Sequence, residues 1–233
     1  GKKGLSGKFM VDYLIEEYFK VWEKDLIKAK YLLTQNEYYL EAILVLSCYI
    51  GALASLRYPQ LNDNKSYKKT VLKYSGKKDI YEKIDLIFFY QWPKSDFKDV
   101  GSYKKLKNYD EIKSILVSEF GDEAVVKNDM RYVTQQDIIK RILAKPFKGL
   151  DRQNLESNLP LFSICEILYR YVRCHAVHNK SFPLVNSFFS TDGVVRYEDN
   201  HIITGEFLFQ TVENILHKLE GECLKKGKWP YEL

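Results

Sequence analysis

The sequence predicts an all-α fold, a helical bundle with one small β-hairpin. Apolar residues recur at spacings of three and four through most of the chain, as they do along one face of an α-helix. Glycine and proline stand where these patterns stop, which is where helices usually end. Two short runs, "VVRYE" and "HIIT", are separated by Asp199-Asn200, and this arrangement is typical of a hairpin.

Composition indicates an ordinary globular protein. The chain has 233 residues, of which 45% are hydrophobic and 29% charged, so we expect one large domain over residues 1–233. The net charge of +5 is compatible with a nucleic-acid partner but does not indicate one. The four cysteines form no CxxC pair, which favours a reducing compartment. No apolar run approaches the roughly 20 residues that span a bilayer, so we expect a cytoplasmic protein without a membrane partner.

The two ends of the chain are expected to form the bundle core, over residues of about 7–57 and 158–227. The second helix, "YYLEAILVLSCYIGALASL", is apolar nearly all round, so we expect it at the centre. The last helix is expected from about Gly205 to Lys226, because lysines fill its last turn and Gly227 follows.

The middle of the chain, about residues 58–151, reads as a series of shorter helices packed on the core as an elaboration. One helix, "DIYEKIDLIFFYQW", is expected to run to Pro93, and another, "YDEIKSILVSEFG", to close on Gly121. Thr134 with Asp137 is expected to cap a third helix, since a threonine side chain can accept a bond from the helix's free backbone N–H groups.

One helical segment gathers charged residues in an otherwise apolar pattern. Glu166, Arg170 and Arg173 follow at spacings of four and three and therefore share a face. His178 lies five residues beyond Arg173, which is roughly 140° around an ideal helix. Both side chains can serve one site only if the helix loosens, as a π-bulge or a frayed last turn would allow, or if the site is wide. The simpler interpretation is a solvated helix face with a routine i,i+4 pair between Glu166 and Arg170.

The same segment resembles the signature of the HEPN superfamily, an arginine followed after four to six residues by a histidine. Here the signature is Arg173, "CHAV", His178, and "EILYRYVRCHAVHNKSFPL" is similar to the form "LYRxRCxxVH" of one bacterial HEPN group. "LEAILVLSCYIGALASLRYP", "IYEKIDLIFFYQWPKSDF" and "VVRYEDNHIITGEFLFQTVENIL" resemble that group as well. The likeness covers the chain from about Glu37 to Leu219 and implies a HEPN-like bundle with a helical insertion.

The chain departs from the family pattern at two positions. Cys174 follows the signature arginine, where asparagine or another polar residue is common. Gly51 stands in the first core helix, where related sequences often carry an acid. Glu37, Glu41 and Glu166 are alternative sources of a carboxylate. Gly51 has a structural explanation too, since a small residue suits a close crossing of two helices.

The resemblance implies a metal-independent ribonuclease without a cofactor, in which a homodimer brings two Arg/His pairs into one cleft. His178 titrates near neutrality and suits general acid–base work, while the fork of Arg173 suits a phosphate. Asn179, Arg170 and Glu166 are expected to support this pair. His175 and His178 could share a metal, but no third ligand is evident and arginines repel a cation, so we predict no metal site.

Lysines and tyrosines alternate in the segment after the second helix. Lys68, Lys69 and Lys73 are the members expected to contact RNA, because lysines can follow a phosphate backbone while neighbouring tyrosines stack on bases. The competing explanation is a solvated helix face.

Three functions remain open from the sequence. The first is an endoribonuclease in a toxin or phage-defence context, with RNA and an antitoxin or regulatory protein as partners. The second is a non-catalytic HEPN module that binds nucleotide, RNA or a protein. The third is a dimerising helical bundle with a purely structural role.

Overall fold

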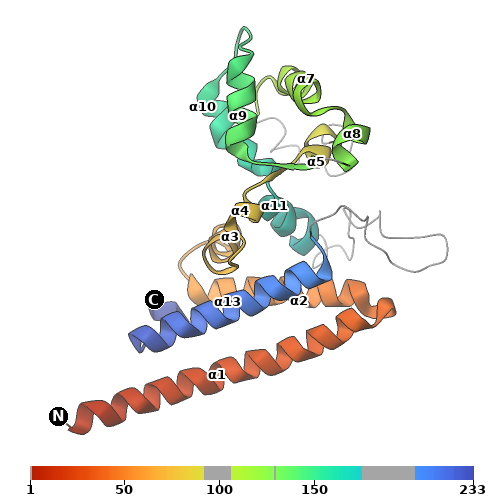
Figure 1. Ribbon diagram of the computed structural model, residues 1–233. Helices are drawn as coiled ribbons and strands as arrows, with labels where there is room; N and C mark the ends of the chain where they lie inside the picture. The colour runs from red at the N-terminus through yellow and green to blue at the C-terminus, as the bar shows by residue number, and fades with distance from the viewer. Residues whose placement is uncertain (1, 92–105, 129, 175–202) are drawn as a thin grey trace. The chain divides into compact units, whose positions relative to one another are not determined.

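The computed structural model describes residues 2–91, 106–128, 130–174 and 203–233, and these are mostly helical. The all-α prediction is therefore confirmed (Figure 1). The chain divides into two compact units. The long-helix unit comprises Gly1–Lys78 and Val172–Leu233, and the middle unit comprises Asp79–Tyr171.

These bounds differ from the expected core and elaboration. The helix that follows residue 62 belongs with the long helices, and residues 158–171 belong with the middle unit. The organisation of the whole chain as one HEPN-like domain stays a prediction.

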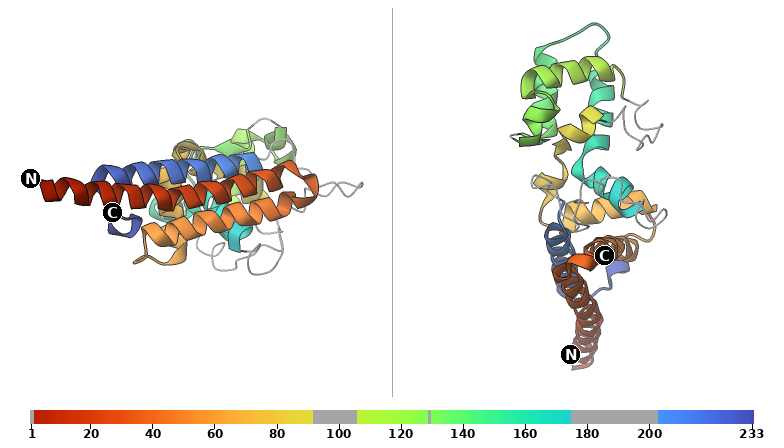
Figure 2. Two further views of the ribbon diagram at one scale, coloured as in Figure 1. Left: turned by 90° about the horizontal axis from the view of Figure 1, so that it is seen from below. Right: turned by 90° about the vertical axis from the view of Figure 1, so that its right-hand side faces the viewer.

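Three helices, α1 (Lys2–Thr34), α2 (Tyr39–Arg57) and α13 (Gly205–Lys226), build the long-helix unit. The short η1 (Asn36–Tyr38) turns the chain between α1 and α2. Both α2 and α13 lie along α1 and run antiparallel to it, as the two views of Figure 2 show.

Ring and charge contacts show that α13 pairs antiparallel with α1. The ammonium of Lys30 lies 5.2 Å from the centroid of the Phe209 ring, and eight residues further along α13 His217 approaches Glu23 at 3.9 Å. Gly205, at the start of α13, donates its backbone N–H to the Tyr39 hydroxyl at 2.7 Å. A Cβ atom at Gly205 would lie 2.3 Å from a methyl group of Leu33, so glycine lets this helix start close to its neighbours.

The helix α2 is the central core helix, as predicted. It packs on α1, α3 and α13, but its buried residues lie on about half of its circumference, and Cys48, Ala52 and Ser55 on the other half are exposed. Among the described residues it is also the one helix long and apolar enough to span a membrane, although we judged its apolar run too short. One such helix is weak evidence for a span, because the core helix of a soluble protein meets the same criteria of length and composition.

A fourth helix, α3 (Asp63–Tyr74), packs on α2 and α13. Its end is held by a polar chain in which Arg57 donates to the Tyr74 hydroxyl at 2.9 Å and that hydroxyl donates to Glu222 at 2.6 Å. Burial and the Glu222 carboxylate raise the pKa of Tyr74 to about 12, so the phenol keeps its proton and acts as a donor. The chain closes with η6 (Pro230–Glu232).

The middle unit is a set of short elements. In chain order these are α4 (Lys78–Tyr81), β1 (Ile84–Asp85), α5 (Leu86–Gln91), α7 (Tyr109–Phe120), α8 (Glu123–Asn128), β2 (Tyr132–Val133), α9 (Gln135–Ala144), α10 (Arg152–Asn158), η3 (Leu159–Phe162), α11 (Ile164–Ile167) and the π-helix η4 (Leu168–Cys174), whose last residues belong to the long-helix unit. The predicted ends at Gly121 and the cap at Thr134 are confirmed, since Gly121 has a φ of 97° and Thr134 accepts a bond from the backbone of Asp137 at 3.2 Å.

The prediction of one continuous helix up to Pro93 is wrong. The chain leaves the helix after Tyr81 and forms β1, which pairs antiparallel with β2 so that Ile84 lies opposite Val133. Asp85 adds a bidentate ion pair with Arg131, with distances of 2.9 to 3.1 Å. Contacts with a distant strand thus override the local helical pattern.

The hairpin predicted near residue 200 falls outside the described residues, apart from Ile203 and Thr204. Thr204 is the N-cap of α13, where its side chain accepts from the Phe207 backbone at 3.0 Å.

Candidate functional site

The signature arginine, Arg173, lies in a π-helix rather than an α-helix. The helix begins at Ser163, whose side chain caps α11, and changes to the wider π geometry from Leu168 to Cys174. A π-helix has i→i+5 hydrogen bonds and often marks a functional segment. The loosening that the Arg173–His178 spacing requires is therefore present up to Cys174.

The Arg173 side chain is held between α2 and α3. Its Nη1 donates to the carboxylate of Asp63 in the first turn of α3. The other edge of the guanidinium lies against Gly51 of α2, where a Cβ atom would be 3.5 Å from Nη2 and 3.6 Å from Nε. The side chain of Arg173 is 19% exposed and that of Asp63 41% exposed, so the pair lies at the surface of the unit.

The surroundings keep Arg173 positively charged. Burial alone would lower the pKa of the guanidinium, but the neighbouring Cys174 sulfur and the Asp63 carboxylate outweigh it, so the net pKa is raised. Burial also raises the pKa of the Cys48 thiol, which the charge of Arg173 partly offsets. Arg173 is thus a fixed cation and Cys48 a protonated thiol at neutral pH.

The carboxylate beside the signature arginine comes from a residue that we had not considered. We named Glu37, Glu41 and Glu166 as alternatives to an acid at position 51, but Asp63 forms the ion pair. Gly51 lies directly beside the guanidinium, so a side chain at this position would meet Arg173. Nothing in the sequence around Asp63 marks it, because 110 positions separate it from Arg173.

Glu166 and Arg170 form the expected i,i+4 pair, in the middle unit. The pair is not on a solvated face, since the Glu166 side chain is only 2% exposed while Arg170 is 26% exposed. A buried carboxylate with its own arginine is best explained as a structural element. The remaining predicted residues, His178 and Asn179, lie outside the described residues, as does His175.

The lysines predicted to contact RNA make contacts within the long-helix unit. Lys73 pairs with Glu222 at 3.0 Å, and the ammonium of Lys69 lies 4.4 Å from the centroid of the Tyr58 ring. Lys68 is half-buried. Their part in RNA binding stays a prediction.

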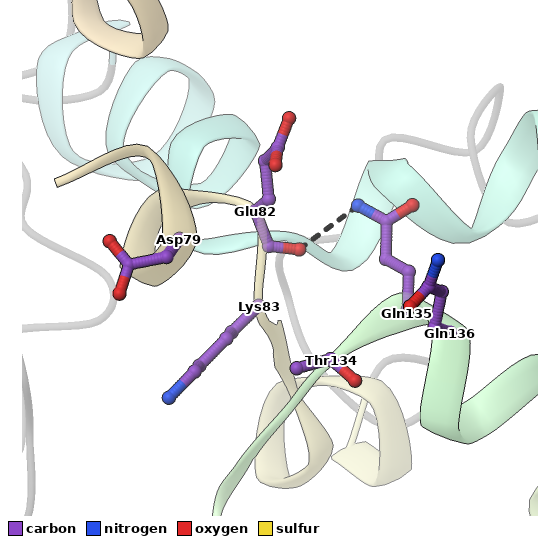
Figure 3. A pocket seen from close by; sticks show the side chains of 6 residues that line it. All are labelled: Asp79, Glu82, Lys83, Thr134, Gln135 and Gln136. Atoms are coloured by element: carbon purple, nitrogen blue, oxygen red, sulfur yellow. Dashed lines mark hydrogen bonds between the residues drawn. The ribbon is translucent and has the colours of Figure 1, made fainter.

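A separate polar pocket of about 420 Å³ opens in the middle unit. Figure 3 shows the side chains around it, and one of them, Gln135, donates to the backbone carbonyl of Glu82 at 2.9 Å. The lining residues are Asp79, Glu82, Lys83, Thr134, Gln135 and Gln136. Charges of both signs line it, and none of these residues belongs to the predicted site.

Over the described parts of the chain, no group of three or more histidine, cysteine or acidic side chains is arranged to hold a metal ion. Comparison with models of protein families, with curated proteins and with solved structures finds no match to this chain. Support for a function therefore comes from the Arg173–His178 motif and from the contacts around Arg173.

Proposed function

We propose that this protein is a metal-independent endoribonuclease in which Arg173 and His178 act on a phosphodiester of RNA. One observation supports it above the others: Arg173 is a fixed cation, oriented by Asp63 at the surface of its unit, in a π-helical segment five residues before a histidine. A planar guanidinium held in this way can bind a phosphate and stabilise the charge that develops in the transition state.

The proposed chemistry needs only proton transfers and charge stabilisation. The 2′-oxygen attacks the adjacent phosphorus and loses its proton to a general base, while the 5′-oxygen leaves with a proton from a general acid. The products are a 2′,3′-cyclic phosphate and a new 5′-hydroxyl. His178 suits one proton transfer because imidazole titrates near neutrality. In a homodimer, His178 of the partner subunit would serve the other.

The wider setting is a cytoplasmic toxin or phage-defence protein, whose partners are RNA and an antitoxin or regulatory protein. Arg170 and Glu166 keep the supporting role that we expected. Their ion pair, in which Glu166 is buried, lies at the start of the helical segment that carries Arg173.

The test is RNA cleavage in the presence of EDTA. The parent protein is expected to cleave, and Arg173→Ala and His178→Ala are expected to be inactive while their circular dichroism and melting temperature match the parent. Arg152→Ala is the control. It also removes an arginine that is paired with a carboxylate, in this case within an exposed i,i+4 pair. A single 2′-deoxynucleotide should block cleavage at its own position. RNA that stays intact with the parent protein would contradict the proposal.

The Arg173–Asp63 ion pair favours a second candidate, a non-catalytic module that binds nucleotide, RNA or a protein. The carboxylate already occupies one edge of the guanidinium, which leaves fewer donors for a phosphate in the transition state. Under this alternative RNA stays intact, but nucleotide or RNA raises the melting temperature, and Arg173→Ala abolishes that shift.

A further inference from the structure

The long helix α1 has two apolar faces, and the described residues of the chain cover one of them. Ile15, Phe19, Leu26 and Ala29 are buried against the rest of the long-helix unit. Large apolar side chains that are 46% to 71% exposed also occur along the helix: Phe9, Met10, Tyr13, Leu14, Val21, Ile27 and Tyr31. At 100° per residue the two sets centre on opposite sides of the helix.

The exposed set is large enough for a stable interface. Seven side chains of this size and exposure present on the order of 700 Å² of apolar surface, and specific dimers bury about 800 Å² per partner. The summed apolar area of this face also exceeds the apolar patches that soluble monomers usually leave in water, about 300–600 Å², although charged side chains stand in its middle. We call it the outer face of α1.

Charges within the outer face differ between its two halves. Glu17 lies in the first half, and Lys20, Lys24 and Lys28 lie in the second. The Glu17 carboxylate bonds Lys20 at 2.7 Å, but both side chains are about half exposed, and such i,i+3 surface pairs exchange partners at little cost. When a second copy of this face is turned end to end, its lysines lie opposite Glu17 of the first copy. Opposite charges then meet in both halves of the face.

We propose that the outer face of α1 binds the same face of a second copy of this chain, with the two helices antiparallel. In the register that sets Glu17 level with Lys24 of the partner subunit, Leu14 lies level with the partner's Ile27. Met10 then lies level with the partner's Tyr31. Two-fold symmetry repeats every one of these contacts, so one helix supplies two charge pairs and two sets of apolar contacts.

A lipid surface fits the outer face less well. Helices that lie on membranes keep charges away from the apolar face, whereas Glu17 and Lys24 project from the middle of this one. Desolvating those charges in lipid would be costly, and an antiparallel partner pairs them instead. The interface also goes beyond the proposed function, because the described contacts of Arg173 are with α2 and α3, and the α1 interface is a second contact beside the one expected between two Arg173/His178 sites.

Charge reversal in the full chain tests the proposal. Glu17→Lys or Lys24→Glu alone sets like charges opposite each other twice per dimer, and each is expected to raise the dimer dissociation constant at least tenfold in sedimentation equilibrium. The double variant Glu17→Lys/Lys24→Glu should return it to within about threefold of the parent. Lys148→Glu, at an exposed position of the middle unit, is the control and should leave it unchanged.

Three results would overturn the proposal. One is a protein that stays monomeric at all concentrations. Another is self-association that neither single reversal weakens, which would leave only an interface elsewhere, such as the one that the proposed function expects near Arg173. The third is binding to phosphatidylglycerol vesicles that Leu14→Glu abolishes while self-association is undetectable. RNA cleavage measured on the same variants keeps the outcomes separate, since failure of the α1 interface does not require loss of the Arg173 chemistry.

Discussion

Two arginine–carboxylate pairs, one chosen from each unit of this protein, differ in burial. In the middle unit the Arg131 and Asp85 side chains are 9% and 3% exposed, and the contact is bidentate. In the long-helix unit the Arg173 and Asp63 side chains are 19% and 41% exposed. A sealed pair can only hold the fold together, whereas a pair at the surface keeps a charged fork within reach of a ligand. Burial therefore assigns Arg131 a structural role, whereas Arg173 stays within reach of a ligand.

Asp85→Ala is expected to have the largest effect on stability. It leaves the buried Arg131 without its carboxylate, and breaking such a pair costs about 3–5 kcal/mol of unfolding free energy. Asp63→Ala is the matched variant in the surface pair, and it should cost less than about 1 kcal/mol. Urea unfolding of both proteins measures the difference, and equal losses would remove the distinction between the two pairs.

Two glycines offer a second comparison, in which we expect changes in unfolding free energy of up to about 1–3 kcal/mol. Gly205→Ala forces a Cβ atom to within 2.3 Å of Leu33, and overpacking of this kind costs about 1–3 kcal/mol. Gly51→Ala meets the Arg173 guanidinium only at ordinary contact distance, so the gain in helix propensity should stabilise the protein by up to about 1 kcal/mol. Thermal unfolding should give shifts of opposite sign. A large loss from Gly51→Ala would mean that the guanidinium is packed more tightly than in the structure.

Glu222 shows how much a charged group that is not deeply buried contributes to the stability of the fold. Burial raises the pKa of this carboxyl, but bonds from Lys226, Tyr74 and Lys73 outweigh it and lower the pKa to about 2. Because the folded-state pKa lies below the unfolded one, the stabilisation is complete above about pH 4.5 and is lost as the pH falls toward 2. Its lysine partners are largely exposed, so we expect only on the order of 1 kcal/mol.

The measurement for Glu222 is the unfolding free energy of the parent and of Glu222→Gln between pH 2 and 7. The parent should be the more stable protein at pH 7, and the difference should shrink through the acid range. A constant difference would show that the carboxylate acts by its shape and not by its charge.

Helix ends were predictable from the sequence because their causes are local. The cap at Thr134, the stop at Gly121 and the bounds of α13 each depend on residues within one turn. The break at Ile84 was not predictable, since its strand partner is Val133, far along the chain. The sequence pattern there is helical, and only the tertiary pairing overrides it.

The candidate site shows the same limit. The choice of Arg173 comes from the resemblance to the HEPN signature, and its spacing from His178 adds the need for a loosened helix, which the π-helix supplies up to Cys174. Asp63 could not be found in this way, because it reaches Arg173 only after α3 has packed on α2. Local patterns therefore indicate the arginine, and only the fold identifies the carboxylate that orients it.

The decisive experiment asks whether Arg173 acts on the RNA phosphate. It measures the initial rate of RNA cleavage in EDTA and the unfolding free energy, both for the parent and for Arg173→Ala. If Arg173 acts on the phosphate, cleavage should fall by about 100-fold or more while the unfolding free energy changes by less than about 1 kcal/mol. Cleavage that Arg173→Ala leaves unchanged, or that declines only as the protein unfolds, would contradict the account.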